Sequence, residues 1–512
     1  MKLAISSLIK EIDSFAAEHI GIPTLELMRR SGAAVAGAVR SYIPDGGSVV
    51  ILAGKGNNGG DGYAAAVELM KDCLVKVFDV FGEGQRTEEG RHFLKLFSDA
   101  GGKIEVLTLS AGQKSEIKSA ACIVDAVFGT GFRGEIPEVV RELATAVSEA
   151  VGATKIAVDV PMGVNADDGS VDPMTPTMHA TVELSFIKPG IVSYPARSFV
   201  GQLIYDDLGL PRDVLEEHFD FKYQLCDADF AVANLPTRKS DSNKGTFGKA
   251  LIITGSERYR GAGRLSLESA LRGGAGYVTY LGTETLTDDF SREMPEAIYK
   301  SADLGTPEGQ DVASELASRS NAVLIGSGSG NSDAIRTVTA RLLSEEGGVL
   351  VLDADAINAL SEVEGALSLI KKARRPVILT PHPLEFARLT AHDVAVVQKK
   401  RLAAAVRFAA ENKCILVLKG AGTIVTDGRE IFINGSGSSA LAKAGSGDVL
   451  AGFVASLAAQ NIEPLTAAAL GVYFHGAAGD RLAEEFSTYG VTPSDLPKQI
   501  ARELARAEQA RK

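Results

Sequence analysis

The segment AGKGNNGGDGYAAAVEL, residues 53–69, places two asparagines and an aspartate among five glycines, directly after the apolar run VVIL. Glycine allows positive φ and a close approach of the backbone to a ligand. The spacing matches neither GxGxxG nor GxxxxGK[ST], so it predicts neither of those nucleotide motifs. A glycine-rich turn without a ligand would be enough to explain the glycines. The polar side chains of Asn57, Asn58 and Asp61 favour a ligand site instead.

Two more polar segments follow apolar runs in the same half of the chain. DAVFGTGFRGE begins at Asp125, and DVPMGVNADDG begins at Asp159. Because ligands bind at the carboxyl ends of parallel strands, we expect Asn58, Asp125 and Asp159 to lie together at the opening of one ligand pocket. Oxygen ligands without His or Cys suit a hard cation, or a ribose and amide ligand, but not zinc. A single aspartate at a strand end is usually a cap or turn former, whereas this set indicates a functional site.

The second half of the chain has a strong local pattern, AKAGSGDVLAGFVASLAA at 442–459. Gly445, Ser446 and Gly447 precede a clean helical run, and Asp448 falls in its first turn. Free N–H groups and the positive end of a helix dipole stabilise a transferring phosphoryl group. Asp448 is either a helix cap or the base that accepts a proton from an attacking hydroxyl. The neighbouring glycines favour the base.

Other segments of this half carry compatible chemistry. TPHPLE at 380–385 offers His382 and Glu385 between prolines, and LKGAGTIVTDG at 418–428 offers Lys419 in a flexible loop. No second histidine lies at ligand spacing, so we expect His382 to bind substrate by a hydrogen bond and not to bind a metal.

These groups must be positioned by strands that alternate with helices. Short β-branched runs occur at 49–53, 74–80, 121–127, 155–160 and 181–186, and then at 249–255, 322–326, 348–355, 376–380, 414–420 and 423–428. The pattern predicts an α/β protein with parallel sheets covered on both faces. The charged stretch 211–229 marks the expected domain boundary. We expect domains at 1–215 and 226–512.

Net charge, cysteine spacing and hydropathy exclude several classes of function. The chain has 512 residues and a net charge of −12, which argues against a general nucleic-acid surface. Its four cysteines are widely spaced, as expected in a reducing compartment. Lys10, Glu11 and Asp13 interrupt the start of the chain, and no run of about 18 apolar residues exists. We therefore expect a cytoplasmic protein with small-molecule substrates, without nucleic-acid or membrane partners, that forms a homo-oligomer.

The first half resembles the NAD(P)H-hydrate epimerase domain. The resemblance rests on GNNGGDG, DAVFGTG and DVPMG in this order, followed by SFIKPG, and covers about residues 1–215. It implies a Rossmann-like fold and exchange of the R and S hydroxyl configurations at C6 of hydrated NADH or NADPH. It also implies Asp159 as a substrate contact and acid–base residue. The implied substrate cradle comprises Asn57, Asn58, Gly59, Gly60, Asp61, Gly129, Thr130, Gly131, Phe132, Arg133, Gly134 and Glu135.

The same resemblance implies a potassium ion held by Asn58 and Asp125. Met162 stands where the family usually has serine, so the third ligand must come from the backbone or be lost. Lys55 replaces the family's proline and either meets a phosphate or points to solvent.

The second half resembles the ribokinase-like superfamily and, within it, the ADP-dependent NAD(P)H-hydrate dehydratases, over about residues 226–505. AGSGD carries the wider resemblance; YRGAGRLSLESALRGGAG, LDADAIN and TPHPLE carry the narrower one. It implies that ADP, with Mg²⁺, phosphorylates the C6 hydroxyl and that phosphate then leaves. Implied substrate contacts are Ala262, Gly328, His382 and catalytic Asp448; implied nucleotide contacts are Lys419, Gly420, Ala421, Gly422, Thr423, Gly445, Ser446 and Gly447.

Two departures from the dehydratase pattern affect loops only. Leu384 replaces a glycine, and GSGSSAL at 435–441 replaces the family's GNPG run. Together the two resemblances predict one repair protein that epimerises hydrated coenzyme and dehydrates its S form. The rival for the second half is a vitamin or sugar kinase that stops at the phosphorylated product. The rival for the first half is a non-catalytic binding module.

Overall fold

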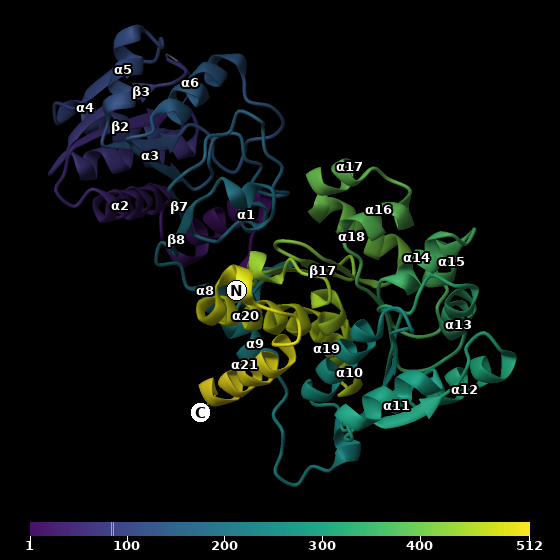
Figure 1. Ribbon diagram of the computed structural model, residues 1–512. Coiled ribbons are helices and arrows are strands. Elements are labelled where there is room, and N and C mark those ends of the chain that lie inside the picture. Colours follow the sequence, from purple (N-terminus) through teal and green to yellow (C-terminus); the bar gives the residue numbers. More distant parts are fainter. Residues whose placement is uncertain (83, 85, 512) are drawn as a thin grey trace. The chain divides into compact units, whose positions relative to one another are not determined.

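The computed structural model describes residues 1–82, 84 and 86–511. The chain divides into two units: Lys2–Tyr223 forms one, and the other begins at Gln224 and includes Met1. In each unit a sheet is combined with many helices (Figure 1). None of the helices among the described residues is both long and apolar enough to cross a membrane.

The first unit has a parallel sheet in the order β4-β3-β2-β5-β6-β7-β8. After β2 the chain adds β3 and β4 on one side of it, and then crosses over to place β5 on the other side of β2. This reversal between β2 and β5 is where doubly wound sheets bind ligands. The strands are β2 (Ser48–Ala53), β3 (Leu74–Asp79), β4 (Lys103–Val106), β5 (Cys122–Ala126), β6 (Thr154–Val158), β7 (Ala180–Leu184) and β8 (Gln202–Asp206), after a short β1 (Lys2–Leu3).

Helices cover both faces of this sheet because its strands alternate in side-chain direction. In β2, Val49 and Ile51 face the core shared with α2, α3 and α4, whereas Val50 and Leu52 face the core shared with α5 and α6. The helices are α1 (Ser6–Phe15), α2 (Thr24–Tyr42), α3 (Asn57–Leu69), α4 (Glu88–Asp99), α5 (Ala111–Ser119), α6 (Glu138–Glu149), α7 (Pro189–Val192) and α8 (Arg212–His218).

The second unit has strands in the order β9-β18-β17-β16-β15-β14-β13-β10-β11-β12. The section from β16 to β12 is parallel. The strands are β9 (Tyr223–Cys226), β10 (Lys249–Ile253), β11 (Tyr277–Gly282), β12 (Ile298–Ser301), β13 (Ala322–Ile325), β14 (Val349–Leu352), β15 (Val377–Leu379), β16 (Ile415–Leu418), β17 (Ile424–Thr426) and β18 (Ile431–Asn434).

The expectation of parallel strands is wrong for one of the predicted runs. The run at 414–420 becomes β16, the run at 423–428 becomes β17, and the two pair antiparallel. Only residues 419–423 connect them. A parallel crossover needs a dozen or more residues, so this short connection forces a hairpin.

One helix of the second unit is enclosed almost completely. Every residue of α19 is buried except Gly447 and Asp448 in its first turn. This explains its apolar sequence, because a helix buried on all sides has no polar face. It packs between α10 and α20. The helices are α9 (Ala228–Asn234), α10 (Arg260–Arg272), α11 (Glu284–Glu293), α12 (Pro307–Ser318), α13 (Asp333–Ser344), α14 (Asp355–Ser361), α15 (Ala366–Lys371), α16 (Pro383–Thr390), α17 (Val394–Lys399), α18 (Arg401–Asn412), α19 (Ser446–Ala459), α20 (Pro464–Gly490) and α21 (Leu496–Ala510).

Candidate active sites

The loop from β2 to α3 uses its glycines for close contacts within the protein. A Cβ on Gly54 would overlap the carbonyl oxygen of Val127, and a Cβ on Gly59 would overlap the carbonyl group of Gly54. Gly60 is buried and donates its N–H to Gly56 O at 3.2 Å. Gly59 and Gly60 therefore seat the start of α3 against the sheet, and neither lies among the residues that line the adjoining cavity.

A cavity of about 170 Å³ opens at this edge of the first sheet. Six of the predicted cradle residues line it: Asn57, Asn58, Asp61, Gly129, Thr130 and Asp159. Within the described part of the chain, the N–H groups of Asn57, Asn58 and Gly59 have no hydrogen-bond acceptor. Free N–H groups at a helix start attract anions, so this end of α3 suits a phosphate or carboxamide group.

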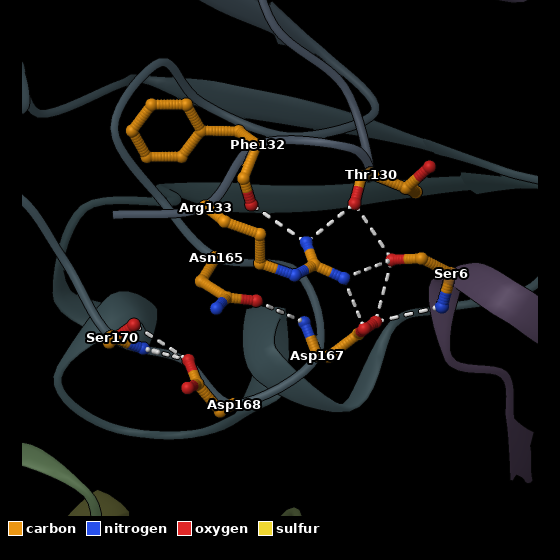
Figure 2. A network of polar contacts seen from close by, with 8 residues as sticks. All are labelled: Ser6, Thr130, Phe132, Arg133, Asn165, Asp167, Asp168 and Ser170. Carbon is orange, nitrogen blue, oxygen red and sulfur yellow. Dashed lines mark hydrogen bonds and ion pairs between the residues drawn. The ribbon is translucent and has the colours of Figure 1, made fainter. Parts of the chain in front are cut away.

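The rest of the predicted cradle, Gly131 to Glu135, lies outside the cavity lining and has other partners. Phe132 packs into the apolar core. Arg133 donates to the carbonyl oxygens of Thr130 and Phe132, each at 2.7 Å, and forms an ion pair with Asp167 (Figure 2). Glu135 pairs with Arg141 at 3.2 Å. In this structure Arg133 stabilises the loop.

The same network fixes the first helix, as Figure 2 shows for Ser6. The N–H and the hydroxyl of Ser6 each donate to Asp167 Oδ1 at 2.7 Å, and the hydroxyl also donates to Thr130 O at 2.8 Å. Helix α1 is thereby tied to a loop that lines the cavity. It contributes Asp13, a lining residue that sequence reasoning did not assign, because no local pattern links it to the distant motifs.

Asn58 and Asp125 form the candidate cation site. The Asn58 amide nitrogen donates to Phe128 O at 2.7 Å, which leaves its Oδ1 buried and without a partner among the described residues. Asp125 accepts N–H bonds from Met162 at 2.7 Å and Val127 at 3.2 Å. Burial raises the pKa of Asp125 to about 7, against the opposing effect of these two bonds.

A buried amide oxygen without a partner suits a cation with oxygen ligands. The Met162 side chain is not available to such an ion, because it packs in the apolar core while only its N–H reaches Asp125. No group of three or more His, Cys, Asp or Glu side chains in the described ranges is placed to hold a metal ion.

Asp159 forms an ion pair with Lys188, which sequence reasoning quoted within SFIKPG but did not assign. Lys188 is fully buried and also lies 3.4 Å from Glu183. Burial lowers the pKa of Lys188, but the two carboxyl groups outweigh it and the net shift is upward. Burial raises the pKa of Glu183 to about 8. One ammonium between two carboxyl groups thus holds Asp159 at the cavity wall.

Two lining residues of this cavity have left-handed backbones although they are not glycine. Asp159 follows β6 with φ 64°, and Ser185 follows β7 with φ 66°. The Ser185 hydroxyl is buried without a partner in the described structure. Such conformations are unfavourable for residues with a Cβ and concentrate at functional sites.

In the second unit the start of α19 is open to a ligand. Gly445 precedes the helix with φ 101°, and Ser446 is held by a contact of 3.0 Å from its carbonyl oxygen to His475 Nε2. The N–H groups of Gly447 and Asp448 have no acceptor within the described residues. These two residues combine free donors with the positive end of the helix dipole.

Lys419 brings a cation to this helix start. Its ammonium lies 2.9 Å from Asp353 Oδ1 and would be 3.4 Å from a Cβ on Gly447. Asp353 is buried and also accepts hydroxyl bonds from Ser327 and Thr380, each at 2.7 Å. Burial lowers the pKa of Lys419, but the charges of Asp353 and Glu385 raise it overall, so the group is a permanent cation.

Asp448 has no hydrogen-bond or ion-pair partner in the described chain. Burial raises its pKa to about 7; the charge of Asp353 adds to this shift, and Lys419 opposes it. A carboxyl that titrates near neutrality beside a phosphoryl-binding helix start is suited to accept a proton.

The predicted nucleotide loop, residues 419–423, is shaped by a buried arginine that sequence reasoning missed. Arg401 donates to Ala421 O at 2.7 Å and to Lys419 O at 3.1 Å. Gly420 adopts φ 131°, and the Thr423 hydroxyl donates to Gly420 O at 2.8 Å. The loop is therefore ordered by the hydrogen bonds from Arg401 and by the bond between Thr423 and Gly420.

The predicted contacts for hydrated coenzyme fall on two segments. Gly328 has φ 61° and lies against Ala262, so the structure brings these two predicted residues together. His382 caps α16: its Nδ1 accepts the N–H groups of Leu384 at 3.1 Å and Glu385 at 3.2 Å. Burial and then the charge of Lys419 lower the pKa of His382.

Comparison with protein families gives two matches. Residues 24–190 match the family described as YjeF-related protein N-terminus, and residues 250–502 match the NAD(P)H-hydrate dehydratase family.

Curated proteins with the description bifunctional NAD(P)H-hydrate repair enzyme match along the whole chain. The protein of Moorella thermoacetica is 33% identical, over 97% of this chain and 95% of its own length. That of Thermofilum pendens is 34% identical, over 98% and 96%. That of Escherichia coli K12 is 32% identical, over 95% and 91%.

Solved structures match the second unit. An ADP/ATP-dependent NAD(P)H-hydrate dehydratase from Bacillus subtilis, co-crystallised with ATP and Mg²⁺, is 30% identical. The match has a TM-score of 0.50 and covers 55% of this chain and 98% of that one. A ribokinase-like superfamily protein from Enterococcus faecalis is 26% identical with the same TM-score, over 56% and 98%.

Proposed function

This chain belongs to the family of bifunctional NAD(P)H-hydrate repair enzymes, and we propose that it restores hydrated NADH and NADPH with two active sites, one in each unit. The first unit epimerises the R and S hydrates. The second unit dehydrates the S hydrate at the expense of ADP.

The observation that carries the dehydratase proposal is the arrangement of Asp448, Lys419 and the free N–H groups at the start of α19. The N–H groups of Gly447 and Asp448 bind the phosphoryl group in transit, and Lys419 offsets its charge. The Asp448 carboxylate accepts the proton of the C6 hydroxyl as that oxygen attacks the phosphorus of ADP. Phosphate is a better leaving group than hydroxide, so the lone pair of the ring nitrogen expels it from C6 and leaves an iminium cation. Loss of a proton from C5 to solvent then forms the C5=C6 double bond of the reduced nicotinamide ring.

For the epimerase we propose that the hydrated nicotinamide ring enters the cavity of the first unit. Asp159, fixed by Lys188, contacts the ring and moves a proton. The free N–H groups at the start of α3 hold an anionic group of the coenzyme.

We propose that Asn58 and Asp125 hold K⁺, and the unpaired Asn58 oxygen supports this assignment. When bound, the ion supplies positive charge that lowers the pKa of Asp125 and fixes the Asn58 side chain. In the second unit, Mg²⁺ is expected to bind together with the nucleotide.

We expect the enzyme to work in the cytoplasm. Its four cysteines are free, as is usual in that reducing compartment, and its coenzyme substrates are used there.

An assay of separated R and S hydrates tests the proposal. With ADP and Mg²⁺, the S hydrate should regain the absorbance of the reduced nicotinamide ring at once. The R hydrate should regain it only after epimerisation. A vitamin or sugar kinase would leave the absorbance unchanged with either hydrate, which would reject the dehydratase. A first unit that only binds ligand would leave the R hydrate at its spontaneous rate.

A further inference from the structure

The cavity of the first unit is lined by a carboxyl group, that of Asp13, which lies outside the sequence motifs. Asp13 lies on α1 and lines the cavity together with Asp61 from α3 and Asp159 after β6. Its side chain is half-buried and has no hydrogen-bond or ion-pair partner among the described residues. A carboxyl that faces a cavity and has no partner within the protein is available to a bound ligand.

The position of Asp13 is held firmly. Ser6 at the start of α1 is bonded to Asp167 and Thr130, and the latter also lines the cavity (Figure 2). Ile12, the residue before Asp13, is fully buried in the core. The carboxyl is thus presented by an anchored helix, as a group that must meet a reacting atom requires.

The surroundings of Asp13 favour a group that holds and releases a proton. Burial raises its pKa to about 6; Lys188 opposes this shift and Asp159 adds to it. The other charged groups that line the cavity are Asp61 on α3, Lys10 on α1 and Glu89 on α4. Apolar lining comes from Leu27, Met28 and Leu184. A carboxyl in an apolar pocket beside a second, ionised carboxyl is a recurring acid–base arrangement.

We propose that Asp13 is a second acid–base residue of the epimerase, which acts on the C6 hydroxyl together with Asp159. This inference rests on the proposed epimerase function. Two groups are needed, because inversion at C6 requires oxygen to leave from one face of the ring and return to the other.

The proton and electron balance is simple. Protonated Asp13 gives its proton to the C6 hydroxyl, the C6–O bond breaks with its electron pair on oxygen, and water leaves. The lone pair of the ring nitrogen forms the N1=C6 bond of an iminium cation. A water on the other face then attacks C6 and loses its proton to the Asp159 carboxylate. Proton exchange with solvent resets both carboxyl groups, and the reverse epimerisation runs the same steps backward.

The charges of the cavity suit this intermediate. Asp13 becomes an anion as the ring becomes a cation, whereas the charge of Asp159 is already paired with Lys188. The Asp13 carboxylate, which has no cationic partner in the described structure, is therefore the group that stabilises the cationic ring.

The test uses Asp13→Asn in the full-length protein. The asparagine keeps the shape of the side chain but cannot transfer a proton. We expect the epimerisation rate, corrected for the spontaneous reaction, to fall about 100-fold or more, as the loss of a general acid does elsewhere. The decline of the wild-type rate above pH about 6, where Asp13 loses its proton, should disappear in the variant.

Three controls keep the result interpretable. Glu11→Gln changes an exposed carboxyl of the same helix and should epimerise normally. Asp13→Glu should recover a large part of the rate. Dehydration of the S hydrate by the same Asp13→Asn preparation should be unchanged, since that reaction belongs to the second unit.

The outcomes separate the two proposals. If the wild type does not accelerate epimerisation, the proposed function of the first unit is wrong. If the wild type does so and Asp13→Asn stays within about twofold of it, the role of Asp13 is rejected. In ¹⁸O-water each epimerisation should place one labelled oxygen at C6, and a product without label would overturn the C–O cleavage step.

Discussion

The ammonium nitrogen of Lys419 lies 2.9 Å from Oδ1 of Asp353, whose side chain is only 2% exposed. Asp353, which follows β14, is held by Ser327 after β13 and Thr380 after β15, the two strands that flank β14. Because Asp353 is fixed in this way, it also fixes the ammonium group of Lys419, which lies next to Gly447 at the start of α19.

Replacing Lys419 by methionine should damage both stability and catalysis. The buried Asp353 would lose its counter-charge, which costs roughly 3 kcal/mol of unfolding free energy. The phosphoryl group would lose a cation, and kcat for dehydration should fall at least about 100-fold. Urea unfolding and the ADP-dependent assay measure the two effects.

Adding Asp353→Asn to Lys419→Met separates these effects, because it removes the unpaired charge. Much of the stability should return while the activity stays low. Lys399→Met, at an exposed site, should match the wild type in both measurements. Recovery of activity in the double variant would show that Lys419 serves stability alone.

Replacing Asp448 by asparagine should stop dehydration while leaving nucleotide binding nearly intact. The amide keeps the helix start and its N–H donors but cannot accept a proton, so kcat should fall about 1000-fold. ADP affinity by calorimetry should stay within about twofold. Equal loss of affinity and turnover would instead make Asp448 a structural residue.

The raised pKa of Asp448 sets a pH dependence for turnover. A base must be ionised, so the wild-type rate should rise with pH, reach half of its maximum at pH about 7, and level off above that. A rate that is flat from pH 5.5 to 8 would contradict the assignment of Asp448 as the base.

Stability should depend on Asp448 in the opposite sense. A carboxyl with a raised pKa binds more protons in the folded than in the unfolded chain, so it destabilises the fold as pH rises from about 4 through about 7. Asp448→Asn removes this effect. The variant should melt above the wild type at pH 8, and the difference should vanish near pH 4. A melting difference that does not change with pH would count against the raised pKa.

Removing K⁺ should slow epimerisation and leave dehydration by the second unit untouched. Asn58→Ala and Asp125→Asn each delete a proposed ligand, so each should raise the K⁺ concentration for half-maximal epimerisation about tenfold or more. The measurement is a KCl titration at constant ionic strength with NaCl as the balancing salt. Met162→Leu is the matched control, because it keeps the N–H that binds Asp125. An unchanged K⁺ dependence in both ligand variants would place the ion elsewhere.

Sequence patterns located most of the central strands but missed two of them and several edge strands. The fully buried runs at 49–53 and 322–326 became β2 and β13, because a strand covered on both faces is apolar throughout. β11 and β18, which lie inside the second sheet, were not predicted. The edge strands β4, β8 and β12 were not predicted either. These strands lie at sheet edges and are partly exposed, so polar residues interrupt their pattern.

The site residues also fall into two groups, those that a local sequence motif identifies and those that only the fold brings to the site. Asn57, Asp159, Lys419 and Asp448 follow strands or begin helices within recognisable local motifs. Asp13, Lys188, Asp167 and Arg401 act on residues far away in the sequence, and only the fold brings them near. Glycines of the first motif were assigned to ligand contact, whereas Gly54, Gly59 and Gly60 make close contacts inside the protein.

The helix cap formed by His382 fixes the tautomer of its ring. Since Nδ1 accepts two backbone N–H groups, the neutral imidazole must carry its hydrogen on Nε2. Towards a ligand, this side chain therefore acts only as a donor. It can donate to a carbonyl or hydroxyl oxygen, and it cannot pair with a group that only donates hydrogen bonds.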